Sequence, residues 1–134
     1  MDPVSPAGPL LTGRNGGTDM PNNKQPKIRP RDKVRAVVPK LVQVMDDVVY
    51  NDIWERPQLS KRDRSLITVA ALMALDSRDS LKRHMVRAKE NGVTDEEIGE
   101  LVTHLAFYAG FPAAMAAAAL AVEVVAAETS GQAR

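Results

Sequence analysis

The sequence predicts a compact all-α domain of five to six helices. Apolar residues recur at the spacing of one helical face along most of the chain after residue 33. Two helix-start patterns, Ser60 with Asp63 and Thr94 with Glu97, each precede such a stretch. No segment shows a convincing strand pattern, so these observations together favour helices throughout.

Residues 1–30 are rich in Pro, Gly and Asn and have almost no apolar periodicity. This composition predicts a disordered leader, inside which Met20 offers an alternative start. The helical domain is then expected to span residues 31–130.

The first helix is expected from Lys33 to about Tyr50 or Trp54. Its apolar positions have helical spacing, although most of them are valines, which also suit strands. Pro39 lies inside this stretch and is predicted to kink the helix or delay its start, because proline has no N–H to donate.

The middle of the chain predicts two more helices. The first begins after the capping residue Ser60 and covers residues 61–75. The second covers residues 79–91 and stops at Gly92, the residue type that most easily adopts the left-handed conformation at a helix end.

The last two helices are separated by Gly110. The earlier one opens at Thr94 and carries an apolar stripe, and the later one has Pro112 in its first turn and ends near Glu128. The later helix holds seven alanines between residues 113 and 121. Small side chains gain most when packed on several sides, which predicts a homo-oligomeric core; the alternative is the central helix of a monomeric bundle.

The charge balance gives no reason to expect nucleic acid or an anionic membrane as a partner. The chain has 134 residues, with 18 basic and 17 acidic side chains and a net charge of +1. A basic run over residues 24–40 favours a solvated tail over a nucleic-acid arm, because no aromatic residue is interleaved with it. Residues 105–122 are uncharged, but Gly110 and Pro112 interrupt them, which favours a buried helix over a membrane span. No secretory signal is visible, so a cytoplasmic location is expected.

The two histidines are the main candidates for chemistry near neutral pH. His84 shares a helix face with Ser77 and Ser80, and His104 precedes Tyr108 by four residues. Each histidine is either a catalytic group or an ordinary core or interface residue. A metal site that uses both histidines with Glu100 is a weaker interpretation, so no metal is predicted.

Two further residues could serve a binding site. Arg64, beside Asp63, either binds a carboxylate or belongs to a solvated first turn. Trp54 is either a core anchor or the wall of a pocket.

Several spaced pieces of the chain resemble the carboxymuconolactone decarboxylase family, which shares its fold with alkylhydroperoxidase D-type proteins. The pieces are the segments 54–68, 81–84, 91–98 and 104–114, and the resemblance covers about residues 34–128. It implies an alkylhydroperoxidase D-like helical fold that assembles as a homotrimer or homohexamer, with pockets between helices and near subunit contacts.

The redox branch of that family carries Cys-x-x-Cys-x-x-x-His. Here the same frame has Ser77, Ser80 and His84, and the chain has no cysteine. A serine hydroxyl cannot cycle to a disulfide, so peroxidase and disulfide-reductase activity are excluded.

The resemblance therefore implies a cofactor-independent decarboxylase, or a related lyase or isomerase. Its expected substrate is a small lactone carboxylic acid such as 4-carboxymuconolactone, and its expected role lies in the catabolism of aromatic compounds. The alternative is a non-catalytic helical oligomer that binds a small ligand or a protein partner.

For a decarboxylase, we expect His84 to act as general acid and Arg64 to hold a carboxylate or the developing oxyanion. His104 and Tyr108 are candidate second donors. The remaining candidates would bind substrate: Ser77, Ser80, Trp54 and Phe111, the last two as apolar walls. No cofactor is needed, because the substrate's own lactone accepts the electrons.

Overall fold

The computed structural model describes residues 30–132, and these residues contain α-helices, short helical turns and no strand. The elements are α1 (Pro30–Val37), α2 (Pro39–Val44), η1 (Met45–Tyr50, π-helical), η2 (Ile53–Glu55, 3₁₀), α3 (Lys61–Ala74), α4 (Arg78–Glu90), α5 (Asp95–Ala109) and α6 (Phe111–Gln132). The prediction of an all-α fold is confirmed. The predicted leader lies outside the described residues, apart from Pro30.

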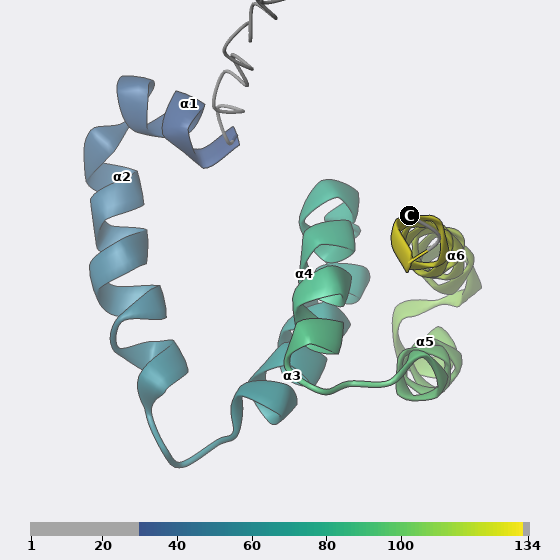
Figure 1. Cartoon of the computed structure of the whole chain (residues 1–134). Coiled ribbons are helices and arrows are strands. Elements are labelled where there is room, and N and C mark those ends of the chain that lie inside the picture. The colour runs from purple at the N-terminus through teal and green to yellow at the C-terminus, as the bar shows by residue number, and fades with distance from the viewer. Residues whose placement is uncertain (1–29, 133–134) are drawn as a thin grey trace, which may run out of the picture.

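The helices form two parts of unequal size (Figure 1). Helices α3 to α6 pack together, with α6 against both α4 and α5. Residues 30–55, which we call the arm, stand to one side as a column of short helices. The arm joins the packed helices at its lower end, where η2 contacts α3.

The predicted effect of Pro39 is confirmed, because the first helix is broken there. Val38 leaves the helical conformation with φ −128° and ψ 65°, and Pro39 starts α2. A residue before proline is pushed out of the α region by contact with the proline ring. The break turns α1 sideways from α2, as Figure 1 shows, so α1 lies across the top of the arm.

The sequence signals at the other helix ends are also confirmed. Thr94 and Glu97 make both bonds of a capping box at the start of α5, and the Ser60 hydroxyl accepts from the Asp63 N–H at the start of α3. Gly92 and Gly110 have φ of 94° and 92°, the region that glycine adopts without strain. The final helix runs to Gln132, four residues beyond its predicted end.

The core lies between α3, α4, α5 and α6. Its largest fully buried side chains include Met73 from α3 and Met85 from α4. The rest of the buried apolar cluster is formed by Val69, Leu81, Ala88, Val93, Ile98, Val102, Ala106, Ala114, Ala117 and Val124. Because Leu81, Met85 and Ala88 commit one face of α4 to this core, the opposite face of α4 is turned toward the arm.

Within one chain, α6 is not a central helix. It packs against α4 and α5 on one side, while Met115 and Val122 on another side are exposed. Residues 111–131 are long and apolar enough to cross a membrane, a weak criterion that core helices also satisfy. Glu123 and Glu128 of this helix form ion pairs with Lys82 and Lys89 of α4.

Candidate active site between the arm and α4

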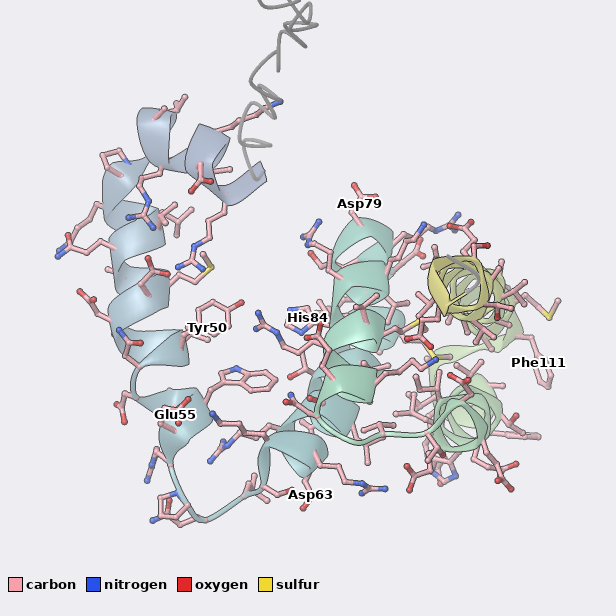
Figure 2. The ribbon with its side chains drawn as sticks, viewed as in Figure 1. Tyr50, Glu55, Asp63, Asp79, His84 and Phe111 are labelled. Carbon is pink, nitrogen blue, oxygen red and sulfur yellow. The ribbon has the colours of Figure 1, made fainter. Side chains whose placement is uncertain are left out.

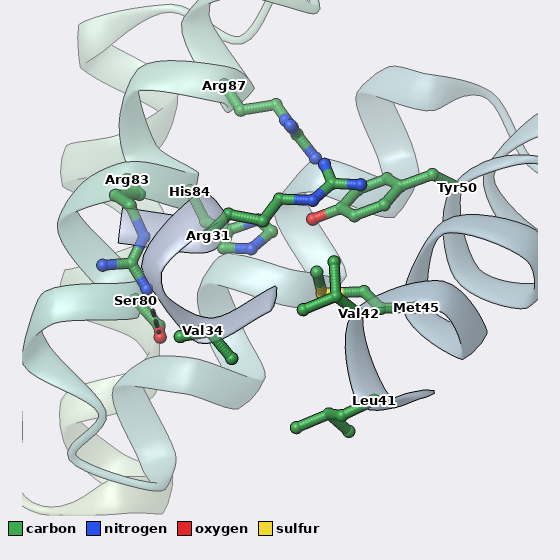
Figure 3. A pocket seen from close by; sticks show the side chains of 10 residues that line it. All are labelled: Arg31, Val34, Leu41, Val42, Met45, Tyr50, Ser80, Arg83, His84 and Arg87. Atoms are coloured by element: carbon green, nitrogen blue, oxygen red, sulfur yellow. Dashed lines mark hydrogen bonds between the residues drawn. The ribbon is translucent and has the colours of Figure 1, made fainter. Parts of the chain in front are cut away.

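A cavity of about 600 Å³ lies between the arm and α4 (Figure 3). This volume falls within the usual range of sites for small organic ligands. The arm lines the cavity with apolar side chains and with Arg31 and Tyr50, and α4 lines it with polar and cationic side chains. The lining residues are Arg31, Val34, Leu41, Val42, Met45, Tyr50, Ser80, Arg83, His84 and Arg87.

The α4 residues reach the cavity because of helical periodicity. Ser80, His84 and Arg87 are four and three residues apart, which places them on one face of the helix. The other face carries the buried residues Leu81 and Met85. Packing of α4 onto the core therefore fixes the direction of His84 toward the arm.

His84 is half-buried beside Trp54, whose ring centroid is 6.4 Å from the centroid of the imidazole. Its Nδ1 atom is buried and has no hydrogen-bond partner among the described residues. Burial lowers the pKa of His84 below its ordinary value, and the positive charges of Arg87 and Arg83 lower it further. These surroundings therefore favour the neutral imidazole.

Three arginines give the cavity a positive charge. Arg83 donates to the Ser80 hydroxyl at 3.0 Å, and Arg87 lies over the rings of Tyr50, at 4.8 Å, and Trp54, at 5.7 Å. The third arginine, Arg31, lies 5.5 Å from the centre of the Tyr50 ring. The residues that line this cavity include no carboxylate, so it suits an anionic ligand.

The structure brings together some of the predicted site residues. His84 and Ser80 line the cavity, and Trp54 lies beside His84. Trp54 also lines a neighbouring cavity of about 320 Å³ that shares Tyr50 and Arg87 with the first. Trp54 is thus a half-buried neighbour of His84 that lies outside the buried core cluster.

Ser77 and Arg64 lie outside the cavity lining. Ser77 is the residue before α4 and makes no side-chain capping bond. Arg64 donates from Nη2 to the backbone carbonyl of Arg56 at 3.1 Å, so it holds the loop that precedes α3. Within the single chain, Arg64 is therefore engaged with that loop and is not among the residues that line the cavity of His84.

His104, Tyr108 and Phe111 lie on the outer face of α5 and α6. Figure 2 shows Phe111 on the side of the molecule away from the arm, whereas His84 points toward the arm. His104 and Tyr108 are exposed, with ring centroids 4.9 Å apart. The two histidines therefore do not converge on one cavity within a single chain, because α4 and α5 expose different faces of the packed helices.

The cavity also contains four charged or aromatic residues that the sequence analysis does not predict for the site. Arg83 and Arg87 carry a usable signal, since they flank His84 on its own helix. Tyr50 was seen only as a helix end. Arg31 was assigned to a solvated basic tail, but it belongs to α1 and lines the cavity.

Within residues 30–132, no three or more His, Asp or Glu side chains are grouped to hold a metal ion.

The helical fold agrees with the comparison with protein families. The model of the carboxymuconolactone decarboxylase family matches residues 39–123, and the chain belongs to this family. The family match includes α4 and most of the arm but not Arg31.

Two curated relatives carry specific names. The chain is 44% identical over 75 residues to a 4-carboxymuconolactone decarboxylase of Acinetobacter baylyi, a match that covers 56% of each protein. It is 33% identical over 75 residues to a nitrosuccinic acid decarboxylase of Metarhizium robertsii, covering 56% of this chain and 52% of the relative. The chain thus spans about half the length of the curated relatives that it matches.

Proposed function

We propose that the protein is a cofactor-independent decarboxylase, or a related lyase or isomerase, that acts on a small carboxylic acid. The observation that carries this proposal is the position of His84, which lines a cavity between Arg83 and Arg87 with no carboxylate in the lining. The names of the two relatives agree with a decarboxylation, and 4-carboxymuconolactone is the first substrate to test.

The two substrates named for the relatives share one chemical property. When the C–CO₂⁻ bond breaks and CO₂ leaves, the electron pair stays on a carbon that can delocalise it. In the lactone the pair moves through the ring to the carbonyl oxygen, and in the nitro acid it moves to the nitro group as a nitronate. A proton then adds to a carbon of the delocalised system, so that the product carries H in place of the CO₂ that has left.

The cavity has groups for both steps. Arg83 can stabilise the oxyanion that develops as CO₂ leaves, and Arg87 adds positive charge that holds a carboxylate of the substrate. His84 then supplies the proton. Apolar side chains such as Val42 and Met45 exclude water from the opposite wall, which strengthens these electrostatic interactions. In this proposal Arg83 and Arg87 take the role that the sequence analysis gave to Arg64.

The proposal predicts different pH dependences for the free protein and its substrate complex. His84 must be protonated to act as an acid, and its pKa is lowered by burial and by the charges of Arg87 and Arg83. We therefore expect kcat/KM to fall as pH rises through a value below the ordinary histidine pKa. Bound carboxylates oppose the charges of Arg83 and Arg87, so kcat should begin to fall only at higher pH. Initial rates from pH 5 to 8 measure both profiles. If kcat and kcat/KM fall at the same pH, the expected effect of bound carboxylates on the protonation of His84 is contradicted.

Release of CO₂ from 4-carboxymuconolactone and from nitrosuccinic acid by the purified full chain tests the function directly. We expect release from at least one of them, above the rate without protein. Trp54 is the only tryptophan and lies at the site, so its fluorescence reports binding separately. Binding of both acids without any CO₂ release would instead support the non-catalytic, ligand-binding alternative.

We also propose that the outer face of α5 and α6 packs against a second copy of the chain, as expected for a homotrimer or homohexamer. Its large side chains are strongly exposed in the single chain, with Tyr108 and Phe107 both 76% exposed. Phe111, Met115 and Val122 extend the same apolar surface along α6. In such an assembly, His104 and Tyr108 would belong to a subunit contact.

Met115→Lys is expected to reduce the assembly to smaller species, because a lysine ammonium would be buried between copies. Ala127→Lys, at an exposed position about a third of a turn around the same helix from Met115, is the matched control and should leave the assembly unchanged. Sedimentation velocity at several protein concentrations measures the mass. An unmodified chain that sediments as a monomer would refute the contact.

A further inference from the structure

We propose that Arg31 of α1 and Arg87 of α4 form a second anion site over Tyr50, which selects substrates that carry two carboxylates. The carboxylate that leaves would face His84, and the carboxylate that is retained would bind at Arg31 and Arg87. This inference rests on the proposed function for its reacting group, but the binding preference can be measured without turnover.

The geometry brings together two cations from separate parts of the fold. The Arg87 guanidinium lies 4.8 Å and the Arg31 guanidinium 5.5 Å from the centre of the same Tyr50 ring. Figure 3 shows both side chains extending over Tyr50 at the edge of the cavity next to His84. The negative face of the ring attracts both cations, which offsets part of their mutual repulsion.

The charges around this point are not balanced by the described carboxylates. Asp46 forms ion pairs with both Arg31 and Arg35, so one carboxylate serves two guanidinium groups. No ion pair joins Arg87 to a carboxylate within residues 30–132. Arg31 also has a buried Nε–H without a hydrogen-bond partner among the described residues. These groups provide donors and positive charge for one more anion.

The retained carboxylate takes no part in the bond changes of the reaction. It keeps its charge before, during and after loss of CO₂, so a site that holds it binds substrate and transition state about equally. Removing such a site should raise KM much more than it lowers kcat. Arg31 is therefore inferred to be a specificity-determining residue rather than a catalytic one.

The arm supplies this selectivity. Arg31 lies before the stretch matched by the family model, which begins at residue 39, whereas Arg87 and His84 lie inside it. Family members with a different α1 could thus keep the reacting end of the cavity and accept other substrates.

Arg31→Gln in the full chain tests the inference, with Arg35→Gln as a matched control. Both arginines pair with Asp46, but only Arg31 lines the cavity. KM is measured for 4-carboxymuconolactone and for its monomethyl ester at the side-chain carboxylate. We expect the unmodified protein and Arg35→Gln to prefer the diacid by at least ~10-fold, and Arg31→Gln to lose most of that preference, in line with charge-assisted binding of a carboxylate. A merely structural role of Arg31 would raise both KM values together.

Binding of succinate and of monomethyl succinate, followed by Trp54 fluorescence, gives the result without turnover. If the unmodified protein prefers succinate and Arg31→Gln removes that preference, the anion site is supported. Absence of CO₂ release would then count against the proposed function but not against the anion site. If Arg31→Gln and the unmodified protein prefer succinate over monomethyl succinate to the same degree, the inference is overturned, even if CO₂ is released. Arg31→Lys serves if Arg31→Gln does not fold, as judged by circular dichroism. Lysine keeps the positive charge but cannot donate two parallel hydrogen bonds to one carboxylate. An undiminished preference for succinate in this variant would therefore overturn the recognition of a carboxylate by the guanidinium of Arg31.

Discussion

Replacing His84 with glutamine is expected to lower kcat for decarboxylation by about 10²- to 10⁴-fold, the usual contribution of general acid catalysis. Glutamine has a similar length and can still donate a hydrogen bond, but it cannot deliver a proton to carbon. The side chain is half-buried and lines the cavity, so the substitution leaves the core face of α4 untouched. Stopped-flow or continuous assays of CO₂ release give kcat and KM separately.

His104→Gln is the matched control, because it makes the same chemical change on α5, outside the cavity that His84 lines. We expect kcat to stay within a few-fold of the unmodified protein. The pH profile provides a second check, since His84→Gln should also remove the descending limb attributed to this histidine. Full turnover in His84→Gln would exclude His84 as the acid and would leave the proton source to another group.

Replacing Met85 with alanine is expected to lower the free energy of unfolding by about 2–5 kcal/mol. Met85 is completely buried in the cluster that joins α3 to α6, on the face of α4 opposite His84. Alanine would remove most of the side chain and leave a cavity that the surrounding helices fill only in part. Urea unfolding followed by circular dichroism measures the change, and an unaltered slope with denaturant indicates that stability alone has changed.

Val86→Ala, at the next position of α4, is the control. Val86 is 40% exposed, so the same kind of truncation should cost much less, about 1 kcal/mol or below. Comparable losses for the two variants would contradict the assignment of Met85 to the core. Because Met85 fixes the orientation of α4, a folded Met85→Ala protein should also bind substrate less tightly.

The helix ends were predictable because their signals are local. A capping box needs only the four residues from Thr94 to Glu97, and the end of α4 needs only Gly92 and its neighbours. The break at Val38 likewise follows from the ring of Pro39. Disulfide chemistry could also be excluded from local information, because both positions 77 and 80 are serine.

The composition of the site was harder to predict. Periodicity placed His84 and His104 on faces of their own helices, but it gave no information on what each face meets. His84 meets the arm, and His104 is exposed with Tyr108. Arg31 stands 56 positions before Arg87 in the sequence, and only the turn of α1 away from α2 brings its guanidinium to the same aromatic ring.

The sequence by itself determined that this protein is an all-α member of its family without thiols, with helices that begin and end at readable signals. The tertiary structure decided which of its charged residues share a cavity. The physical reason is that helix formation depends on neighbours along the chain, whereas the cavity depends on where α4 turns its second face once the first is buried in the core. That second face carries His84, Arg83 and Arg87, and the arm completes it with Tyr50 and Arg31.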